Sequence, residues 1–175
     1  MQPLGLSAFG AATGTWTNIA GGRNLGITAG ADVAFLTFRR IRPVAEVRGT
    51  YPVYDGHVDS QKNVLVGLRL ERQYGRFLPY VDFLAGRGAI DYQNGGYPYN
   101  GFLYIRTVST VYSPGFGVDV DVTRHWAAKA DFQYQHWDAP SVPAGVINPR
   151  VLSVGAVYRF DFNHHYKEGW HNHVR

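Results

Sequence analysis

The sequence predicts an all-β chain that closes into an eight-stranded, antiparallel, up-and-down barrel, and two patterns lead to this expectation. About eight segments alternate apolar and polar residues with a period of two, the period of a β-strand whose two faces meet different surroundings. The connections between these segments are alternately short and long. A length of 175 residues suits one such domain, and nothing in the composition divides the chain in two.

The predicted strands are long for a soluble protein. Most have 12 or more residues, whereas strands in soluble proteins average about five or six. A tilted strand that crosses a bilayer needs about nine to eleven, so strand length favours a membrane barrel. The strands are predicted, in order, at residues 4–17, 25–38, 42–53, 62–73, 77–92, 105–122, 126–137 and 150–162.

Within these segments one face is apolar and the other carries charges, Gly and Ser. The third strand is noisier, and in the fifth Arg87 falls on the apolar face, which predicts a bulge near residues 86–88. The clearest apolar faces are those of Leu25, Ile27 and Val33; of Val64, Val66, Leu68 and Leu70; of Val108, Phe116, Val118 and Val120; of Ala128, Phe132 and Tyr134; and of Leu152, Val154 and Phe160.

The connections predict which end of the barrel faces which compartment. Short ones are centred on residues 39–41, 74–76 and 123–125, and the longer ones (18–24, 54–61, 93–104 and 138–149) are rich in Gly, Pro, Asn and Asp. In outer-membrane barrels the short turns are periplasmic and the long loops extracellular. The short-turn rim is therefore expected to hold both ends of the barrel.

Alternation alone does not say which face is inside, but residue size and aromatic placement do. A narrow interior needs small residues beside its charges, and the polar face is rich in Gly and Ser. Aromatic residues also mark the strand ends, as in the two girdles of a membrane barrel. The predicted girdle comprises Trp16, Tyr51, Tyr74, Trp126 and Trp137.

Composition narrows the class further. No run of about 18 apolar residues is present, which excludes a transmembrane helix. The net charge of +4 is scattered, without a cluster that suggests nucleic acid, and the absence of Cys excludes disulfides and Cys-ligated metal sites. No secretion signal precedes the first strand, so we expect a mature form from which the signal peptide has been removed.

The stretch Val157-Tyr158-Arg159-Phe160-Asp161-Phe162 is similar to the C-terminal aromatic signal of small outer-membrane barrels. With the architecture, it gives residues 4–162 a resemblance to the small eight-stranded OmpA-like family. The resemblance implies a bacterial outer-membrane location and recognition of Tyr158, Phe160 and Phe162 by the barrel-assembly machinery. It also implies a barrel domain at 1–162 and a periplasmic tail at 163–175, although in the family the final Phe often ends the chain.

Inward-facing charges are the first candidate site. Because eight strands leave an interior just wide enough for side chains, these groups are expected to pair into a packed plug, with a proton or ion path as the alternative. The expected network comprises Asp32, Arg42, Glu46, Arg48, Arg69, Glu71, Asp82, Asp119, Asp121, Lys129, Asp131, Arg159 and Asp161.

Three other features are candidates for recognition or chemistry. Tyr97, Tyr99 and Phe102 lie in a loop whose composition suits adaptable recognition or an ordinary turn. The tail carries four His, at 164, 165, 171 and 173, for which a disordered polar tail, metal capture and docking are all open. His136, with Asp138 and Ser141 nearby, is the one local arrangement suited to a lipid-modifying enzyme.

Taken together, the residues predict a non-enzymatic structural or interaction component of the outer membrane that acts through its loops or tail. No cofactor is expected. Expected partners are outer-membrane lipid and lipopolysaccharide, the assembly machinery during insertion, and an envelope protein, but no nucleic acid. A narrow channel or transporter, a lipid-modifying enzyme at the rim and a soluble ligand-binding barrel are the alternatives.

Overall fold

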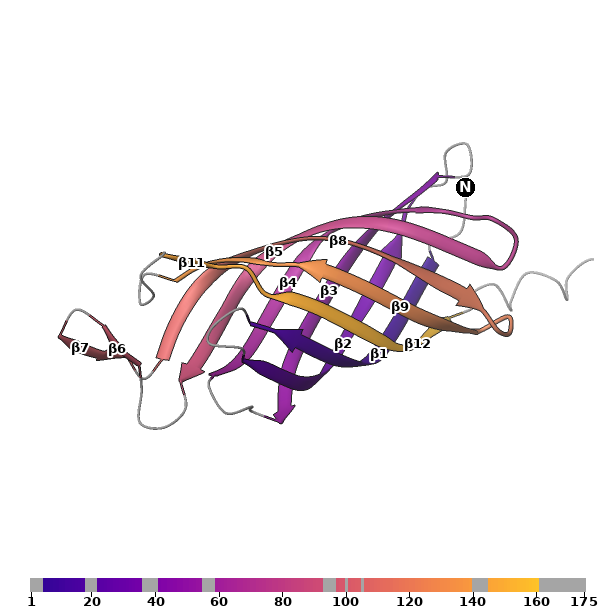
Figure 1. Ribbon diagram of the computed structural model, residues 1–175. Coiled ribbons are helices and arrows are strands. Elements are labelled where there is room, and N and C mark those ends of the chain that lie inside the picture. Colours follow the sequence, from indigo (N-terminus) through magenta and orange to yellow (C-terminus); the bar gives the residue numbers. More distant parts are fainter. Residues whose placement is uncertain are drawn as a thin grey trace, which may run out of the picture.

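The computed structural model describes residues 5–17, 22–35, 41–54, 59–92, 97–99, 101–104, 106–139 and 145–160. These residues form an all-β structure (Figure 1). No helix among them is long and apolar enough to span a membrane. The strands are β1 (Gly5–Trp16), β2 (Arg23–Ala34), β3 (Ile41–Tyr54), β4 (Asp59–Arg72), β5 (Phe77–Tyr92), β6 (Tyr97–Tyr99), β7 (Phe102–Tyr104), β8 (Arg106–Asp121), β9 (Trp126–Tyr134), β10 (His136–Asp138), β11 (Val146–Ile147) and β12 (Arg150–Phe160).

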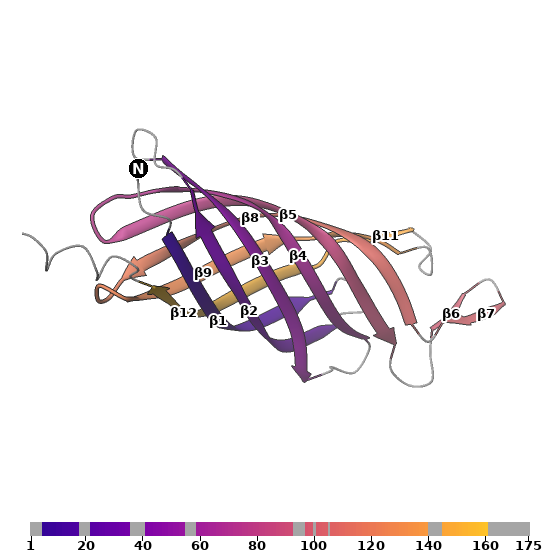
Figure 2. The ribbon, with the colours of Figure 1, turned by 180° about the vertical axis from the view of Figure 1, so that it is seen from behind.

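The sheet closes on itself, as the sequence predicts. Neighbours along the chain pair antiparallel from β1 to β5, then β5 pairs with β8, β8 with β9, and β9 with β12. The circle is completed by β1 and β12, where Leu6 lies opposite Phe160 and Trp16 opposite Arg150. Figures 1 and 2 show the resulting barrel from two sides, with the β6–β7 hairpin projecting from one end.

Two of the eight barrel strands are each divided into two segments by a short irregularity, β9 with β10 and β11 with β12. β10 continues β9 past Gln135 and keeps the pairing with β8, with His136 opposite Tyr112. β11 pairs with β10 through Trp137 and Ile147. Across the interruption the Gln135 N–H donates to the Pro149 carbonyl at 2.9 Å, so the ladder is maintained. The barrel therefore has eight strands built from ten segments.

The short-turn rim holds both ends of the barrel, as predicted. The Arg159 N–H donates to the carbonyl of His125 in the turn after β8. A two-residue hairpin joins β4 to β5, with Tyr74 and Phe77 exchanging backbone hydrogen bonds and Gly75 at φ 60°, which a side chain would strain.

The contrast between short turns and long loops is weaker than predicted. Six residues separate β1 from β2 and six separate β2 from β3, and the loop expected at 54–61 shrinks because β3 runs to Tyr54 and β4 starts at Asp59. The start of β4 was hidden because residues 59–62 are polar on both faces, so no alternation marks them as strand.

The bulge predicted near residues 86–88 is absent, and that prediction is wrong. The β4–β5 and β5–β8 registers run without a shift past Arg87, which points outward. A register shift occurs instead between Leu25 and Gly26 of β2, opposite Pro52 of β3. Proline has no N–H to donate to the ladder, so an irregularity in the pairing is the expected outcome there.

The faces are oriented as a membrane requires. Val66 is 61% exposed and Phe83 56%, whereas Arg69 is 2% and Asp119 1% exposed. A soluble barrel would turn its apolar face inward, so the soluble ligand-binding alternative is contradicted. The apolar wall instead suits contact with lipid.

An arginine at the middle of the outer wall is expected to destabilise the barrel. In Val66→Arg the charge would lie at the centre of β4 on the lipid side, at a cost of about 2–4 kcal/mol, against about 0–1 for Leu25→Arg near the rim. Urea unfolding in lipid vesicles, followed by heat-modifiable migration on gels, measures both. Equal stability of the two variants would contradict the assignment of the outer face.

Candidate functional site

The lumen in the short-turn half of the barrel is filled by a network of charged side chains around two arginines. Arg48 of β3 contacts Glu46 and donates from Nη1 to Asp131 Oδ2 at 2.7 Å, and its Nη2 lies 3.4 Å from Asp82 Oδ2. Gln133 donates to the same Asp82 carboxylate at 2.9 and 3.0 Å. Arg48 therefore joins residues of β3, β5 and β9 across the lumen.

Arg69 of β4 is the second hub. It donates to Glu71, and its Nη2 lies 2.8 Å from Asp119 Oδ2 on β8, two strands away. Its Nη1 is 3.4 Å from Glu46 Oε2 and 3.5 Å from Asp32 Oδ2. Since Glu46 contacts both arginines, the two hubs form one network.

Lys129 of β9 completes the buried cations. Its Nζ lies 3.8 Å from Asp119 Oδ1 and has no hydrogen-bond partner among the described residues. It sits over the rings of Phe9 and Tyr80, at 4.5 and 4.6 Å from their centroids. Attraction to the negative ring faces compensates in part for the missing hydrogen bonds.

Carboxyl groups outnumber cations in this network. Arg48 and Arg69 are consequently each shared among several carboxylates, which offsets the repulsion between the like charges. At the short-turn mouth the half-buried Arg42 adds a further cation by donating to Glu71 Oε2 at 2.8 Å. The fully buried members are Asp32, Glu46, Arg48, Arg69, Glu71, Asp82, Asp119, Lys129 and Asp131.

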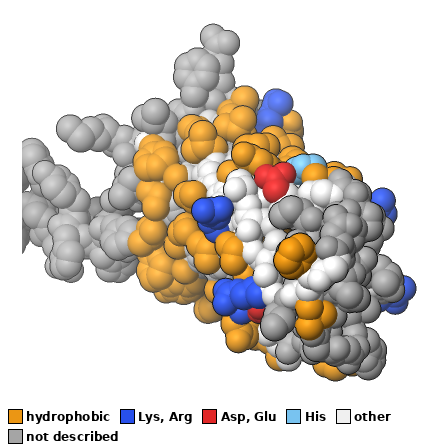
Figure 3. Space-filling view, turned by 90° about the vertical axis from the view of Figure 1, so that its left-hand side faces the viewer, with side chains coloured by type: hydrophobic (Ala, Val, Ile, Leu, Met, Phe, Trp, Pro, Cys, Tyr) orange, Lys and Arg blue, Asp and Glu red, His pale blue; other side chains and the backbone are white. Residues whose placement is uncertain are grey.

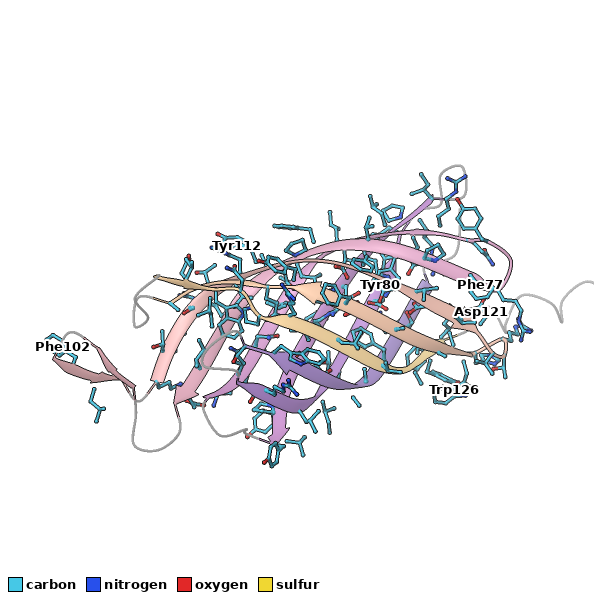
Figure 4. All side chains as sticks on the ribbon, in the orientation of Figure 1. Phe77, Tyr80, Phe102, Tyr112, Asp121 and Trp126 are labelled. Atoms are coloured by element: carbon cyan, nitrogen blue, oxygen red, sulfur yellow. The ribbon has the colours of Figure 1, made fainter. Side chains whose placement is uncertain are left out.

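The remaining predicted members lie apart from this network. Arg159 and Asp121 pair with each other at the short-turn rim, where their side chains are 23% and 26% exposed. Asp161 lies outside the described residues. Figure 4 shows Tyr80 in the body of the barrel and Asp121 at this rim.

Neutral side chains that sequence reasoning missed hold the network in place. The Tyr80 hydroxyl donates to Asp131 Oδ1 at 2.8 Å, and Ser113 donates to Gln133 Oε1 at 2.7 Å. The period of two could have placed Tyr80 in the lumen, because Tyr80 shares its strand face with Asp82. Gly117 of β8 leaves the space for the Tyr80 ring, which an added Cβ would overlap.

A group of hydroxyl side chains lies next to the charge network, toward the long loops. Thr13 contacts Thr28 at 2.7 Å and Ser153 at 2.9 Å, and Thr28 contacts Thr50 at 2.9 Å. These four residues come from β1, β2, β3 and β12. They bond to one another across neighbouring strands, so the wall at this level needs no charge.

The lumen toward the long loops is apolar on one side, which the sequence analysis did not foresee. Trp137, predicted in the outer girdle, is fully buried here, and that prediction is wrong. It packs on Gly88, and its Nε1 donates to Gln135 Oε1 at 2.9 Å. The strand period places residue 137 on the inner face, opposite in direction to Tyr134, and this period outweighs the preference of Trp for interfaces. The cluster comprises Leu65, Leu84, Ile90, Val111, Trp137, Ala139 and Ile147.

The other predicted girdle residues are on the outer wall. Trp16 and Tyr51 are exposed near the long-loop rim, and Tyr74 and Trp126 near the short-turn rim. Trp126 meets Tyr158 edge-on at 5.0 Å, and Tyr158 meets Phe160 at 5.1 Å. Tyr158 and Phe160, two members of the predicted assembly signal, thus join the aromatic girdle at the short-turn rim. Phe162 lies outside the described residues.

The loop predicted for recognition contains the β6–β7 hairpin. Tyr97 pairs with Tyr104 and Tyr99 with Phe102, around Gly101 at φ 79°. Phe102 and Leu103 are 70% and 60% exposed, and Figure 4 shows Phe102 at the far end of the molecule. Of Tyr97 and Tyr99 only the backbone is described.

His136 is not brought into a catalytic arrangement by the described residues. Its Nδ1 lies 2.8 Å from Asn148 Oδ1 and its Nε2 4.0 Å from Asp138 Oδ1. Ser141 and the four tail histidines lie outside the described residues. In the part of the chain that the structure describes, no group of three or more His, Asp or Glu is placed to hold a metal ion.

A closed eight-stranded wall, apolar outside and charged within, defines this chain as a small transmembrane β-barrel of the bacterial outer membrane. The fold has the architecture of the small OmpA-like barrels that the sequence resembles.

Solved structures show the same fold. The attachment invasion locus protein Ail of Yersinia pestis is similar with a TM-score of 0.59 and 14% identity, over 91% of this chain and 100% of that one. Neisserial surface protein A is similar with a TM-score of 0.54 and 14% identity, over 90% and 97%. A major outer-membrane protein of Thermus thermophilus is similar with a TM-score of 0.53 and 13% identity, over 91% and 100%. No known family and no curated protein matches the sequence.

Removing one hub of the lumen network is expected to destabilise the barrel strongly. Arg69→Met would leave Glu71 and Asp119 without their shared cation, at a cost of about 3–5 kcal/mol. The matched control is Arg72→Met on the same strand, an exposed position where a change within about 0.5 kcal/mol is expected. Urea unfolding in vesicles measures the difference, and equal midpoints would show that the network adds nothing.

Proposed function

We propose that this protein is a non-conducting barrel that anchors an interaction surface in the outer membrane. The observation that supports it is the filling of the lumen: the charge network occupies the short-turn half, and the hydroxyl groups and the apolar cluster around Trp137 lie toward the long loops. An eight-stranded barrel filled in this way has no room for a diffusion pore.

The proposed interaction surface is the tip of the β6–β7 hairpin. Phe102 and Leu103 expose adjacent apolar side chains beyond the end of the barrel, away from the lipid-facing wall. Exposed apolar side chains on a projecting element suit contact with another protein. Tyr97 and Tyr99 are proposed to contribute to the same surface, and the tail at 163–175 is proposed as a second docking segment on the periplasmic side.

For assembly we propose that Tyr158, Phe160 and Phe162 form the signal read by the barrel-assembly machinery. The outward aromatic contacts of Tyr158 with Trp126 and Phe160 support this, since they present the side chains on the last strand rather than in the lumen. We further propose that the protein has no enzymatic activity, given the arrangement around His136.

A narrow channel is the second candidate, and one feature favours it. A recess of about 180 Å³ at the short-turn mouth is lined by Arg42 and reaches Asp32 and Glu71. Asp32 keeps one carboxylate oxygen without a hydrogen-bond partner among the described residues. A cation that entered this recess would find the carboxylates of Asp32 and Glu71 in its lining.

Planar-bilayer recordings distinguish the two functions. The full-length protein, with insertion verified by heat-modifiable migration, is expected to give no current steps because side chains fill the lumen between Asp32 and the long loops. Steps that scale with inserted protein, and whose cation selectivity falls in Asp32→Asn, would establish the channel instead.

Site-specific photo-crosslinking in whole cells tests the interaction surface. A photoreactive phenylalanine analogue at Phe102 is expected to give a discrete protein adduct, since this side chain projects beyond the lipid. The same analogue at Phe83, which is comparably exposed on the outer wall, is the control and should crosslink lipid. The proposal fails if position 102 yields only lipid adducts or none.

A further inference from the structure

A groove on the outer wall near the long-loop rim is a candidate lipid site. It has a volume of about 560 Å³ and crosses β2, β3, β4, β5 and β8. Its floor is formed by small residues, among them Ala29, Gly49 and Ala89. At Gly49 an added Cβ would come no closer than 3.7 Å to its neighbours, so the backbone does not require glycine and the space is left open.

Three cations line this hollow. Arg106 lies opposite Asp91 in the β5–β8 pair, and Lys62 lies opposite Ala89 in the β4–β5 pair. Lys62 Nζ is 2.7 Å from Asp91 Oδ2 and Arg106 Nε is 3.5 Å from Asp91 Oδ1. Arg87 forms no ion pair with any described residue. The groove thus has an excess of positive charge with one guanidinium available.

The height of the cations on the wall identifies what they face. On β4, Lys62 comes just beyond the outward series Val64, Val66, Leu68 and Leu70. On β5, Arg87 follows Val81, Phe83 and Ala85 in the same direction. The cations therefore sit where the apolar belt ends toward the long loops. Figure 3, a view onto this end, shows Lys and Arg side chains beside hydrophobic ones on the flank.

We propose that this groove binds a headgroup phosphate of a glycolipid in the outer leaflet, with an acyl chain lying over Val64 and Val108. Charge complementarity supports the assignment: a phosphate accepts paired hydrogen bonds from a guanidinium fork, and Arg87 and Arg106 both reach the hollow. An anion at this level also offsets the cost of holding unpaired cations against lipid. The exposed Tyr51 borders the same groove.

Native mass spectrometry of the full-length protein in detergent tests the site. Rough lipopolysaccharide is expected to bind with one tight equivalent per barrel, and Arg87→Gln/Arg106→Gln should weaken it about tenfold, as expected for losing charge-assisted contacts. The matched control is Arg23→Gln/Arg150→Gln, which removes the same charge from outward positions of β2 and β12 at the same rim. It should leave the tight equivalent in place.

A third variant reverses the sign of the effect. Asp91→Asn removes the competing carboxylate and frees Lys62 and Arg106, so binding should tighten, a result that a misfolded barrel would not give. Dephosphorylated lipopolysaccharide should lose the tight equivalent, and inorganic phosphate alone should bind weakly, since it lacks the acyl contact. Equal weakening by both arginine pairs, or equal binding of the dephosphorylated lipid, would overturn the proposal.

Discussion

Closure of the sheet is the constraint on which the rest of this structure depends. Inside a bilayer no water is present to satisfy backbone N–H and C=O groups, so a sheet can cross only if its first and last strands pair. Here β1 and β12 meet along eleven residue pairs, from Leu6 with Phe160 to Trp16 with Arg150. Once the wall is closed with eight strands, its bore is fixed, and every inward side chain must fit that bore.

The lumen meets this requirement with different chemistry at different heights. In the short-turn half, Arg48 and Arg69 link carboxylates from opposite walls, and glycines such as Gly117 admit the large Tyr80 ring. In the other half, Trp137 and its apolar neighbours occupy one side of the lumen, and buried polar residues such as Asn24 and Gln61 lie in the same half without charge. The outer wall is more uniform, and its departures from apolar character are confined to the rims, where Lys62 and Arg87 lie.

Much of this was accessible from the sequence because one rule, the strand period of two, decides the faces. It correctly separated Leu68 from Arg69 and Phe132 from Asp131, and with them the outer wall from the lumen. The predictions that failed are those in which residue type overruled the period. Trp137 was assigned to the girdle against the period, and a bulge was predicted at 86–88 because an arginine on the lipid side looked improbable. Both residues follow the period.

Other features depend on geometry that no period contains. The sharing of Glu46 between Arg48 and Arg69 depends on how strands curve around the axis, and the groove beside Arg87 depends on Gly49 and Ala29, which are two and three strands away from it. The β6–β7 hairpin was hidden in a Gly- and Tyr-rich loop composition typical of irregular segments.

The layering of the lumen makes the two halves of the barrel electrically unlike. The short-turn half holds six buried carboxyl groups and three buried cations, whereas the buried side chains toward the long loops, polar ones such as Asn24 and Gln61 as well as the cluster around Trp137, are uncharged. A charge introduced beside Trp137 would therefore find no buried counter-charge among the described residues of that half of the lumen.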